Sequence, residues 1–298
     1  MSLDIARLNK SGRKLQKFVK KARRRPSPKE IHNFRTHTRR FEAALIAFAM
    51  NLRRNEQRLL QDLLRLRKRA GKIRDMDVLT ACASTVEVAG EQDCSLQLLE
   101  HLGARRYRHA RRMQTLVRKY GPVLRRRLGR SRARLRKLLM QTDRNVSDDR
   151  PSAPVEAMAT ALELSSELHA PARLSKRNLH SYRLKVKELR NILEMSDTAD
   201  TQPFVDKLGE VKDAIGEWHD WHELVAIATK LLQHGRKCKL LRKLKEISRG
   251  KFEGARSLTY EMRHTYLHNK GRGHRKNNQK PRVDLARPVL VATSAIAD

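Results

Sequence analysis

The segment Ile31-His32-Asn33-Phe34-Arg35 returns later in the chain as Leu179-His180-Ser181-Tyr182-Arg183. Downstream of each copy lies a second repeated segment, first Gly71-Lys72-Ile73-Arg74-Asp75 and then Gly216-Glu217-Trp218-His219-Asp220. Two separated motifs that keep their order and nearly their spacing indicate that a structural unit is duplicated. This duplication predicts two similar faces in one chain.

Apolar residues around both copies of the first motif recur at steps of three and four, which is the period of one face of an α-helix. The stripe predicts that each motif helix buries one side in a helical bundle. The first stripe comprises Ile31, Phe34, Thr38, Phe41 and Leu45, and the second comprises Leu179, Tyr182, Val186, Leu189 and Leu193.

The same period extends over most of the chain and predicts an all-α fold of two four-helix bundles. We expect a first bundle over residues 1–140, a polar linker over 141–154, a second bundle over 155–268 and a disordered basic tail over 269–298. Gly71 falls inside a predicted helix, where a kink or a close helix crossing would explain it. Gly121-Pro122 is expected to bend or interrupt the fourth helix.

The composition indicates a polyanionic partner. The 298 residues contain 67 Lys and Arg against 32 Asp and Glu, which gives a net charge of +35. Such an excess repels itself and attracts polyanions. Apolar runs resembling a signal peptide or a membrane span are absent from the sequence, so we expect a soluble, cytoplasmic protein with no membrane partner.

Three cysteines, Cys82, Cys94 and Cys238, lack the spacing of a metal site. We therefore expect ordinary reduced thiols, no metal and no cofactor.

Cations lie directly beside both apolar stripes, one residue further along the helix. Steps of three and four place them on one side, about one turn apart, where like charges repel. An anion along the row relieves this repulsion, and an elongated polyanion fits an elongated row better than a single phosphate does. The candidate binding residues are His32, Arg35, Arg39 and Arg40 in the first copy and His180, Arg183, Lys187 and Arg190 in the second.

Other charged residues are assigned around these rows. Arg105, Arg108 and Arg112 follow one side of the fourth helix and are expected to extend the binding surface. Asp75 and Asp220 are interpreted as structural acids, and we expect such a carboxylate to order His32 or a nearby arginine through a charge-assisted hydrogen bond.

These motifs resemble those of the CHAD family, the conserved histidine α-helical domain. The first copy matches at Ile31, His32, Phe34, Arg35, Arg39, Arg40 and Phe41, with Glu42 where the family often has Arg, and the stretch at residues 71–79 is also similar. The second copy matches at Leu179, His180, Tyr182, Arg183, Lys185, Val186, Lys187, Leu189 and Arg190, with Asn191 in place of the usual Tyr. The second partner segment, at residues 216–224, departs from the family pattern.

The resemblance covers roughly residues 1–268. It implies two four-helix bundles related by pseudo-twofold symmetry, with a basic groove or pore between them. It also implies binding of inorganic polyphosphate, often at polyphosphate granules. The Glu-x-Glu-x-Lys signature of the triphosphatase domain that some members carry is absent, so we expect no attached catalytic module and no enzymatic activity.

Three alternatives stay open. A charge of +35 also allows weak, non-specific binding of DNA or RNA, although aromatic residues for base stacking are few. A metal-dependent phosphohydrolase would use His219, Asp220 and His222, but helical steps do not direct these three toward one point. A scaffold that docks acidic proteins would also use long basic helices. The preferred polyphosphate length and the oligomeric state do not follow from the sequence.

Overall fold

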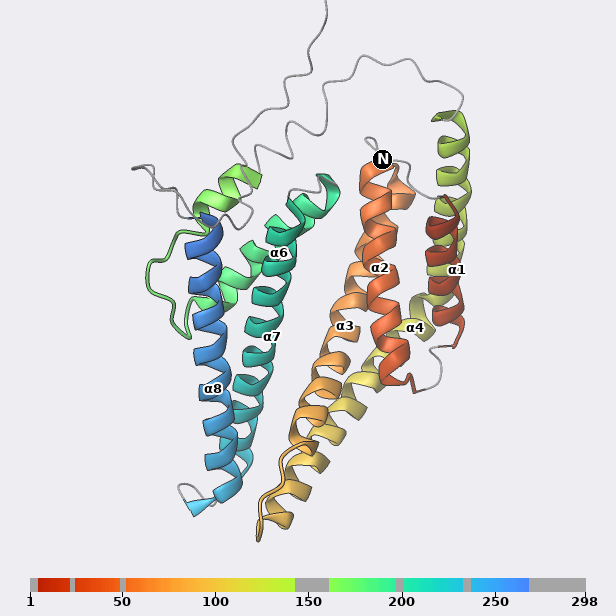
Figure 1. Cartoon of the computed structure of the whole chain (residues 1–298). Helices are drawn as coiled ribbons and strands as arrows, with labels where there is room; N and C mark the ends of the chain where they lie inside the picture. The colour runs from red at the N-terminus through yellow and green to blue at the C-terminus, as the bar shows by residue number, and fades with distance from the viewer. Residues whose placement is uncertain are drawn as a thin grey trace, which may run out of the picture. The chain divides into compact units, whose positions relative to one another are not determined.

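The computed structural model describes residues 5–21, 25–48, 52–142, 161–196, 201–232 and 237–267. Every regular element in these ranges is a helix, which confirms the predicted all-α class (Figure 1). The elements are α1 (Ile5–Lys21), α2 (Pro28–Phe48), α3 (Arg54–Ser84), α4 (Gln92–Thr142), α6 (Leu179–Ser196), α7 (Gln202–Leu231), α8 (Lys239–Met262) and the π-helix η3 (Arg263–Leu267). Residues 161–167 are also helical. None of the helices in these ranges has the length and apolar character to cross a membrane.

The chain divides into two compact units, the first of residues 1–149 and 223–244 and the second of residues 150–222 and 245–298. Residues 223–244, which the sequence predicts within the second bundle, therefore group with the first. One contact that ties them there is the backbone N–H of Lys239, which donates to Glu91 Oε1 at 2.9 Å. Residues 143–154 of the predicted linker and the predicted tail lie outside the described residues. The groove between two bundles stays a prediction.

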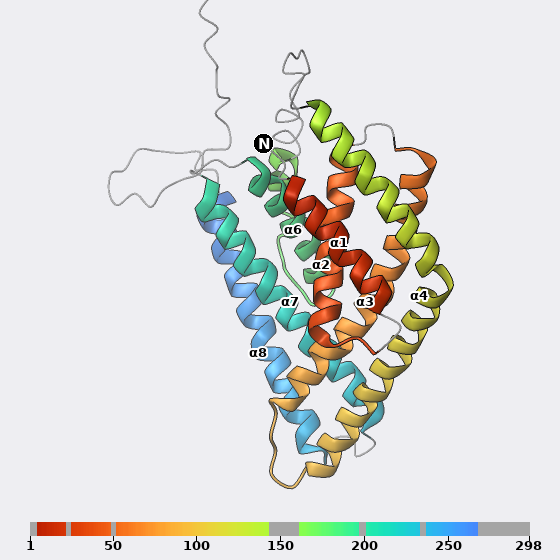
Figure 2. The same ribbon diagram turned by 90° about the vertical axis from the view of Figure 1, so that its right-hand side faces the viewer.

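The core of the first unit lies among α1, α2, α3 and α4. Helix α3 packs against α2 and α4, and α1 packs on α2 and α4 (Figure 2). Ile31, Phe34, Phe41 and Leu45 of the predicted stripe are all buried in this core. Thr38 can share the stripe because its Oγ1 donates to the carbonyl of Phe34 at 2.8 Å, which satisfies a buried polar atom.

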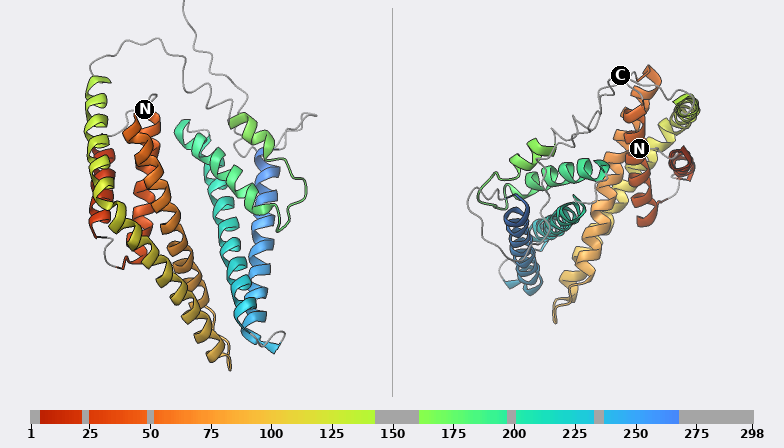
Figure 3. Two further views of the ribbon diagram at one scale, coloured as in Figure 1. Left: turned by 180° about the vertical axis from the view of Figure 1, so that it is seen from behind. Right: turned by 45° about the horizontal axis from the view of Figure 1, so that its top comes forward.

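The core of the second unit is built in a similar way from residues 161–174, α6, α7 and α8. The predicted stripe of α6 is buried from Leu179 to Leu193, and Trp218 of α7 packs into the same cluster. Figure 3 shows α6, α7 and α8 side by side in this unit. Each half of the sequence repeat therefore buries its motif helix in a core of its own.

The two motif helices also begin alike. At α2 the Ser27 N–H donates to Glu30 Oε2 at 2.9 Å, and the Glu30 N–H donates to Ser27 Oγ at 3.3 Å, which is a capping box. Before α6 the Ser175 N–H donates to Asn178 Oδ1 at 2.8 Å. Residues 175–178 form a hydrogen-bonded turn that leads into α6.

Helix α4 runs without a break through Pro122. Of the two outcomes predicted at Gly121-Pro122, a bend or an interruption, the interruption does not occur. The ribbon of α4 does change direction part-way along its length (Figure 1), and a proline inside a helix is an established cause of bending.

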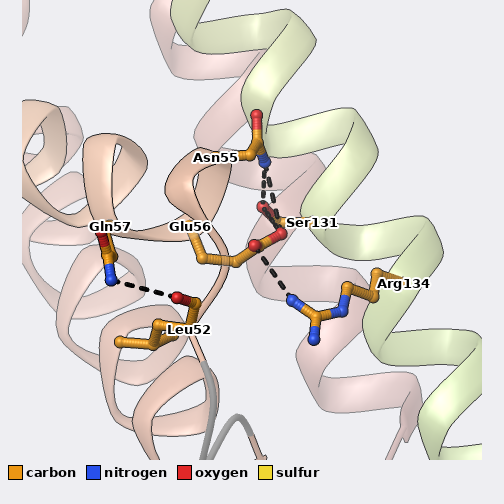
Figure 4. Close-up of polar contacts among 6 residues, drawn as sticks. All are labelled: Leu52, Asn55, Glu56, Gln57, Ser131 and Arg134. Atoms are coloured by element: carbon orange, nitrogen blue, oxygen red, sulfur yellow. Dashed lines mark hydrogen bonds and ion pairs between the residues drawn. The ribbon is translucent and has the colours of Figure 1, made fainter.

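A buried polar cluster joins the first turn of α3 to α4 (Figure 4). Glu56 accepts a hydrogen bond from Ser131 Oγ at 3.2 Å and an ion pair from Arg134 Nη1 at 3.1 Å. Asn55 Nδ2 donates to the same Ser131 Oγ at 3.0 Å. The carboxylate is almost fully buried yet well paired, so it fixes how α3 and α4 pack against each other.

Candidate anion-binding site

Arg35 of α2 lies directly over Gly71 of α3. A Cβ atom built on Gly71 would come within 2.7 Å of Arg35 Nη1, which is closer than two such atoms can approach. Gly71 therefore leaves room for the Arg35 guanidinium as it stands, although glycine weakens a helix interior. The sequence predicted a kink or a close helix crossing here, and the structure shows that the close approach is made by an arginine side chain.

The second unit repeats this arrangement with Arg183 of α6 and Gly216 of α7. A Cβ on Gly216 would lie 2.8 Å from Arg183 Nη2 and 3.2 Å from its Cζ. Arg183 Nε also donates to the carbonyl of Lys212 at 3.0 Å, which fixes the guanidinium on α7. The two sequence motifs are thus two parts of one feature, an arginine on the motif helix and the glycine that receives it.

Further cations surround Arg35 on α2 and α3. Burial lowers the pKa of the Arg35 guanidinium, and the positive charges of Arg39, Arg67 and Arg74 lower it further. The carboxylate of Asp75 acts in the opposite direction on the same pKa. This agrees with the hypothesis that Asp75 orders a nearby arginine, and it leaves the cations of this face in excess over the acids.

Glu42 marks the outer end of the first row. Its Oε2 pairs with Arg67 Nη2 at 3.2 Å, and burial raises the pKa of the half-buried carboxyl. In the described structure Arg67 Nε is buried and has no hydrogen-bond partner. Glu42 therefore neutralises part of the charge here, in keeping with its exclusion from the predicted binding residues.

The structure separates Arg40 from the other members of its row. Arg40 lies toward α1, where its charge, with those of Lys10 and Lys14, adds to burial in lowering the pKa of His37. His37 Nδ1 lies 3.3 Å from Ser11 Oγ of α1. Arg40 is exposed and available to an anion, but it does not share the face of Arg35 and Arg39. His32 is exposed in the first turns of α2.

The three arginines of α4 belong to a different basic cluster. The pKa of His109 is lowered first by burial and then by the charges of Lys72, Arg105, Arg112 and Arg69. Arg105 and Arg108 lower the pKa of His101 in the same way, again after burial. Helical periodicity puts positions 69 and 72 on another side of α3 than positions 67, 71 and 74. Arg105, Arg108 and Arg112 therefore form a second basic surface along α3 and α4 and do not continue the Arg35 face.

Histidines take part in the corresponding face of the second unit. The rings of His180 and His219 meet edge to face with centroids 4.5 Å apart. Burial, His219 and Arg183 all lower the pKa of His180. Lys187 lies one turn beyond Arg183 and is partly exposed. Arg190 reaches Gly209 of α7 and pairs with Glu194 at 2.5 Å, while its Nε has no hydrogen-bond partner in the described part of the chain.

Sequence reasoning missed the cations that α3 and α7 add to these faces. Arg67 and Arg74 precede and follow Gly71, and Lys212 and His219 hold the same two positions around Gly216. The signal that could have found them is this repeated placement of a basic residue four before and three after each glycine, which puts all of them on the glycine's side of the helix.

The described residues do not bring His219, Asp220 and His222 together as three metal ligands, since the one group of three such side chains found among them lies elsewhere.

Comparison with known proteins agrees with the fold and the motifs. A crystal structure of the CHAD domain from the plant Ricinus communis is similar with a TM-score of 0.54 and 18% sequence identity, over 87% of this chain and 89% of that chain. The comparison with curated proteins gave no match. The family model of the CHAD domain matches residues 6–229. Because this match covers most of its length, the chain belongs to the CHAD family.

Proposed function

We propose that this protein binds inorganic polyphosphate through the basic faces of its two units and catalyses no reaction on it. The observation that supports this most is the repeated seating of an arginine on a glycine, Arg35 on Gly71 and Arg183 on Gly216. A guanidinium held in this way presents a fixed fork of N–H donors, which matches the oxygens of a phosphate group.

The spread of the cations favours an extended ligand. In the first unit Arg35, Arg39, Arg67 and Arg74 interact electrostatically across two neighbouring helices. Asp75 and Glu42 offset only part of this charge. A chain of linked phosphates places one negative charge after another along such a face, whereas a single phosphate reaches one or two of the cations.

Nucleic acid is the second candidate, and the placement of aromatic rings argues against it. Base stacking needs exposed aromatic side chains. Among the described residues, the exposed large aromatic side chains are Tyr107, Tyr120 and Tyr260, and these lie on α4 and α8. Where their exposure is described, the motif helices present no exposed Phe, Tyr or Trp, so apart from the histidine rings of the Arg183 face the two faces offer charge and not stacking surfaces.

A binding titration tests the proposal. Polyphosphate of several lengths is titrated at several salt concentrations, with duplex DNA as competitor at equal phosphate concentration. We expect an affinity that falls with salt and is not lost to DNA. Displacement by DNA at equal phosphate would favour the nucleic-acid alternative. The number of long polyphosphate chains bound per protein also tests the predicted groove. If both basic faces bind the same chain, one chain should bind per protein.

A charge-matched pair of double variants locates the site. The site variant, Arg35→Gln with Arg183→Gln, removes the two guanidiniums that lie over glycines. The control variant, Arg125→Gln with Arg126→Gln, removes the same net charge from α4, away from both glycines. We expect the first pair to weaken binding far more than the second. Equal losses would mean a diffuse charge effect with no site.

Orthophosphate release tests the absence of catalysis. We expect none from polyphosphate in the presence of Mg²⁺ or Mn²⁺. Release that disappears in Asp220→Ala would instead support the phosphohydrolase alternative.

A further inference from the structure

Two cysteines that lie far apart in the sequence meet inside the first unit. Cys94 lies in the first turn of α4, and Cys238 directly precedes α8. Both are buried, with 4% and 2% of their surface exposed. Glu91, just before α4, lies beside them. One ligand atom from each of these three residues lies within 4.8 Å of the other two.

Backbone N–H groups hold two of these three side chains in place. Glu91 Oε1 accepts the N–H of Lys239 at 2.9 Å, which leaves Oε2 directed at the Cys238 thiol, 3.5 Å away. Cys238 Sγ in turn accepts the N–H of Leu241 at 3.3 Å. A hydrogen bond from a backbone N–H to sulfur stabilises the thiolate form that binds metals, and outer contacts of this kind orient the ligands of metal sites.

The cluster gathers groups whose negative charges oppose one another. Burial raises the pKa of the Cys94 thiol to about 12, and Glu91 and Cys238 act in the same direction. A divalent cation among the three side chains would stabilise the anionic form of each ligand.

We propose that Cys94, Cys238 and Glu91 form a binding site for a thiophilic divalent cation of the Zn²⁺ class. Two sulfurs and one carboxylate oxygen are suitable zinc ligands, and a water would complete a tetrahedron. With Zn–S bonds of about 2.3 Å and a Zn–O bond of about 2.0 Å, tetrahedral ligand atoms lie roughly 3.5–3.8 Å apart. The distance from Cys238 Sγ to Glu91 Oε2, 3.5 Å, already meets this requirement.

The bound ion would join the start of α4 to the start of α8. Residues 223–244, which include Cys238 and the start of α8, belong to the first compact unit together with α4, so the ion would reinforce that grouping. This site uses none of the residues assigned to anion binding. The two proposals therefore stand or fall separately.

Co²⁺ is the probe that tests the site, added to the full-length, reduced protein. We expect one equivalent to give the visible bands of tetrahedral cobalt and the near-ultraviolet absorption of a cobalt–thiolate bond, and one equivalent of Zn²⁺ to remove both. Binding should release the thiol protons and strengthen as the pH rises. No thiolate absorption at stoichiometric Co²⁺ would overturn the proposal.

Variants separate this site from the histidines elsewhere in the chain. Cys94→Ser and Cys238→Ser should each reduce the thiolate absorption, and Glu91→Gln should weaken binding at least about tenfold. Cys82→Ser is the matched control and should leave the signal unchanged. Thiolate absorption as strong in Cys94→Ser and Cys238→Ser as in the wild type would also refute the site.

Protection of the wild-type thiols avoids any variant that fails to fold. Zn²⁺ should slow alkylation of Cys94 and Cys238, mapped by mass spectrometry, and leave the alkylation rate of Cys82 unchanged. Equal rates with and without Zn²⁺ would contradict the proposal.

Discussion

Replacing Gly71 by alanine perturbs the proposed anion site without removing any charge. The added Cβ would come within 2.7 Å of Arg35 Nη1. Since carbon and nitrogen atoms in contact lie about 3.5–4 Å apart, the guanidinium must retreat by about 1 Å. The atom that meets the new methyl group is the far end of a flexible side chain, so the helices themselves need not move.

The displaced guanidinium should bind phosphate less well. Hydrogen bonds to a charged group contribute about 1.5–3 kcal/mol, and a shift of this size loses part of that. We expect Gly71→Ala to weaken polyphosphate binding by about 1–2 kcal/mol, which is roughly 5- to 30-fold. Alanine is the better helix former by about 0.5–1 kcal/mol. The free energy of unfolding should therefore stay the same or rise.

Isothermal titration with long-chain polyphosphate at fixed salt, together with urea unfolding, measures both quantities. Gly103→Ala is the matched control, because its Cβ would meet no atom within 4 Å. The control should gain stability and bind as the wild type does. An unchanged affinity of Gly71→Ala, beside a normal Gly103→Ala, would refute the role assigned to the seated arginine.

Three further outcomes are expected. Gly216→Ala should lower both the affinity for polyphosphate and the free energy of unfolding, the latter by about 1 kcal/mol in urea. The added Cβ would crowd Arg183 Nε, which donates to the backbone carbonyl of Lys212. An unchanged free energy of unfolding would mean that this hydrogen bond persists. Glu56→Gln should lower the free energy of unfolding by about 1–3 kcal/mol, since a buried, charged hydrogen-bond partner is lost, and a change below the error of the measurement would contradict it. The pKa of His180 is lowered by burial, by His219 and by Arg183. The stability that the neutral His180 ring contributes to the fold is therefore present above the ordinary histidine pKa of about 6.5 and is lost as the pH falls. Polyphosphate should raise that pKa, so binding should take up protons near pH 6 in calorimetry and lose this uptake in His180→Gln.

Much of the fold follows from the sequence because helix formation and burial are periodic. The stripe from Ile31 to Leu45 predicts both the helix and its buried face, and the structure confirms them. The continuity of α4 through Pro122 does not follow, because packing of a long helix against its neighbours can outweigh the local cost of a proline. The grouping of residues 223–244 with the first unit depends on contacts such as Lys239 with Glu91, which join distant segments.

Part of the candidate site also follows from the sequence, and part needed the structure. The sequence repeat identifies Arg35 and Arg183 in its first motif and Gly71 and Gly216 in its second. Steps along a helix do not show which neighbouring helix a side chain will meet, so the direction of Arg40 toward α1 needed the structure. The meeting of Cys94 with Cys238 needed it for the same reason.

The two halves of the repeat share the arrangement of an arginine over a glycine but differ in how their charge responds to pH. Around Gly71 the basic positions are arginines, which stay charged at any physiological pH even where burial lowers the pKa, as for Arg35. At the position equivalent to Arg74 the second half has His219, whose ring packs against His180. The arginines of the first face therefore keep a constant charge, whereas the charge of His180 in the second increases as the pH falls or when a phosphate binds. The arginines of the Arg35 face have no proton to gain, so loss of the proton uptake in His180→Gln, with the uptake retained in His32→Gln, would assign it to the second unit.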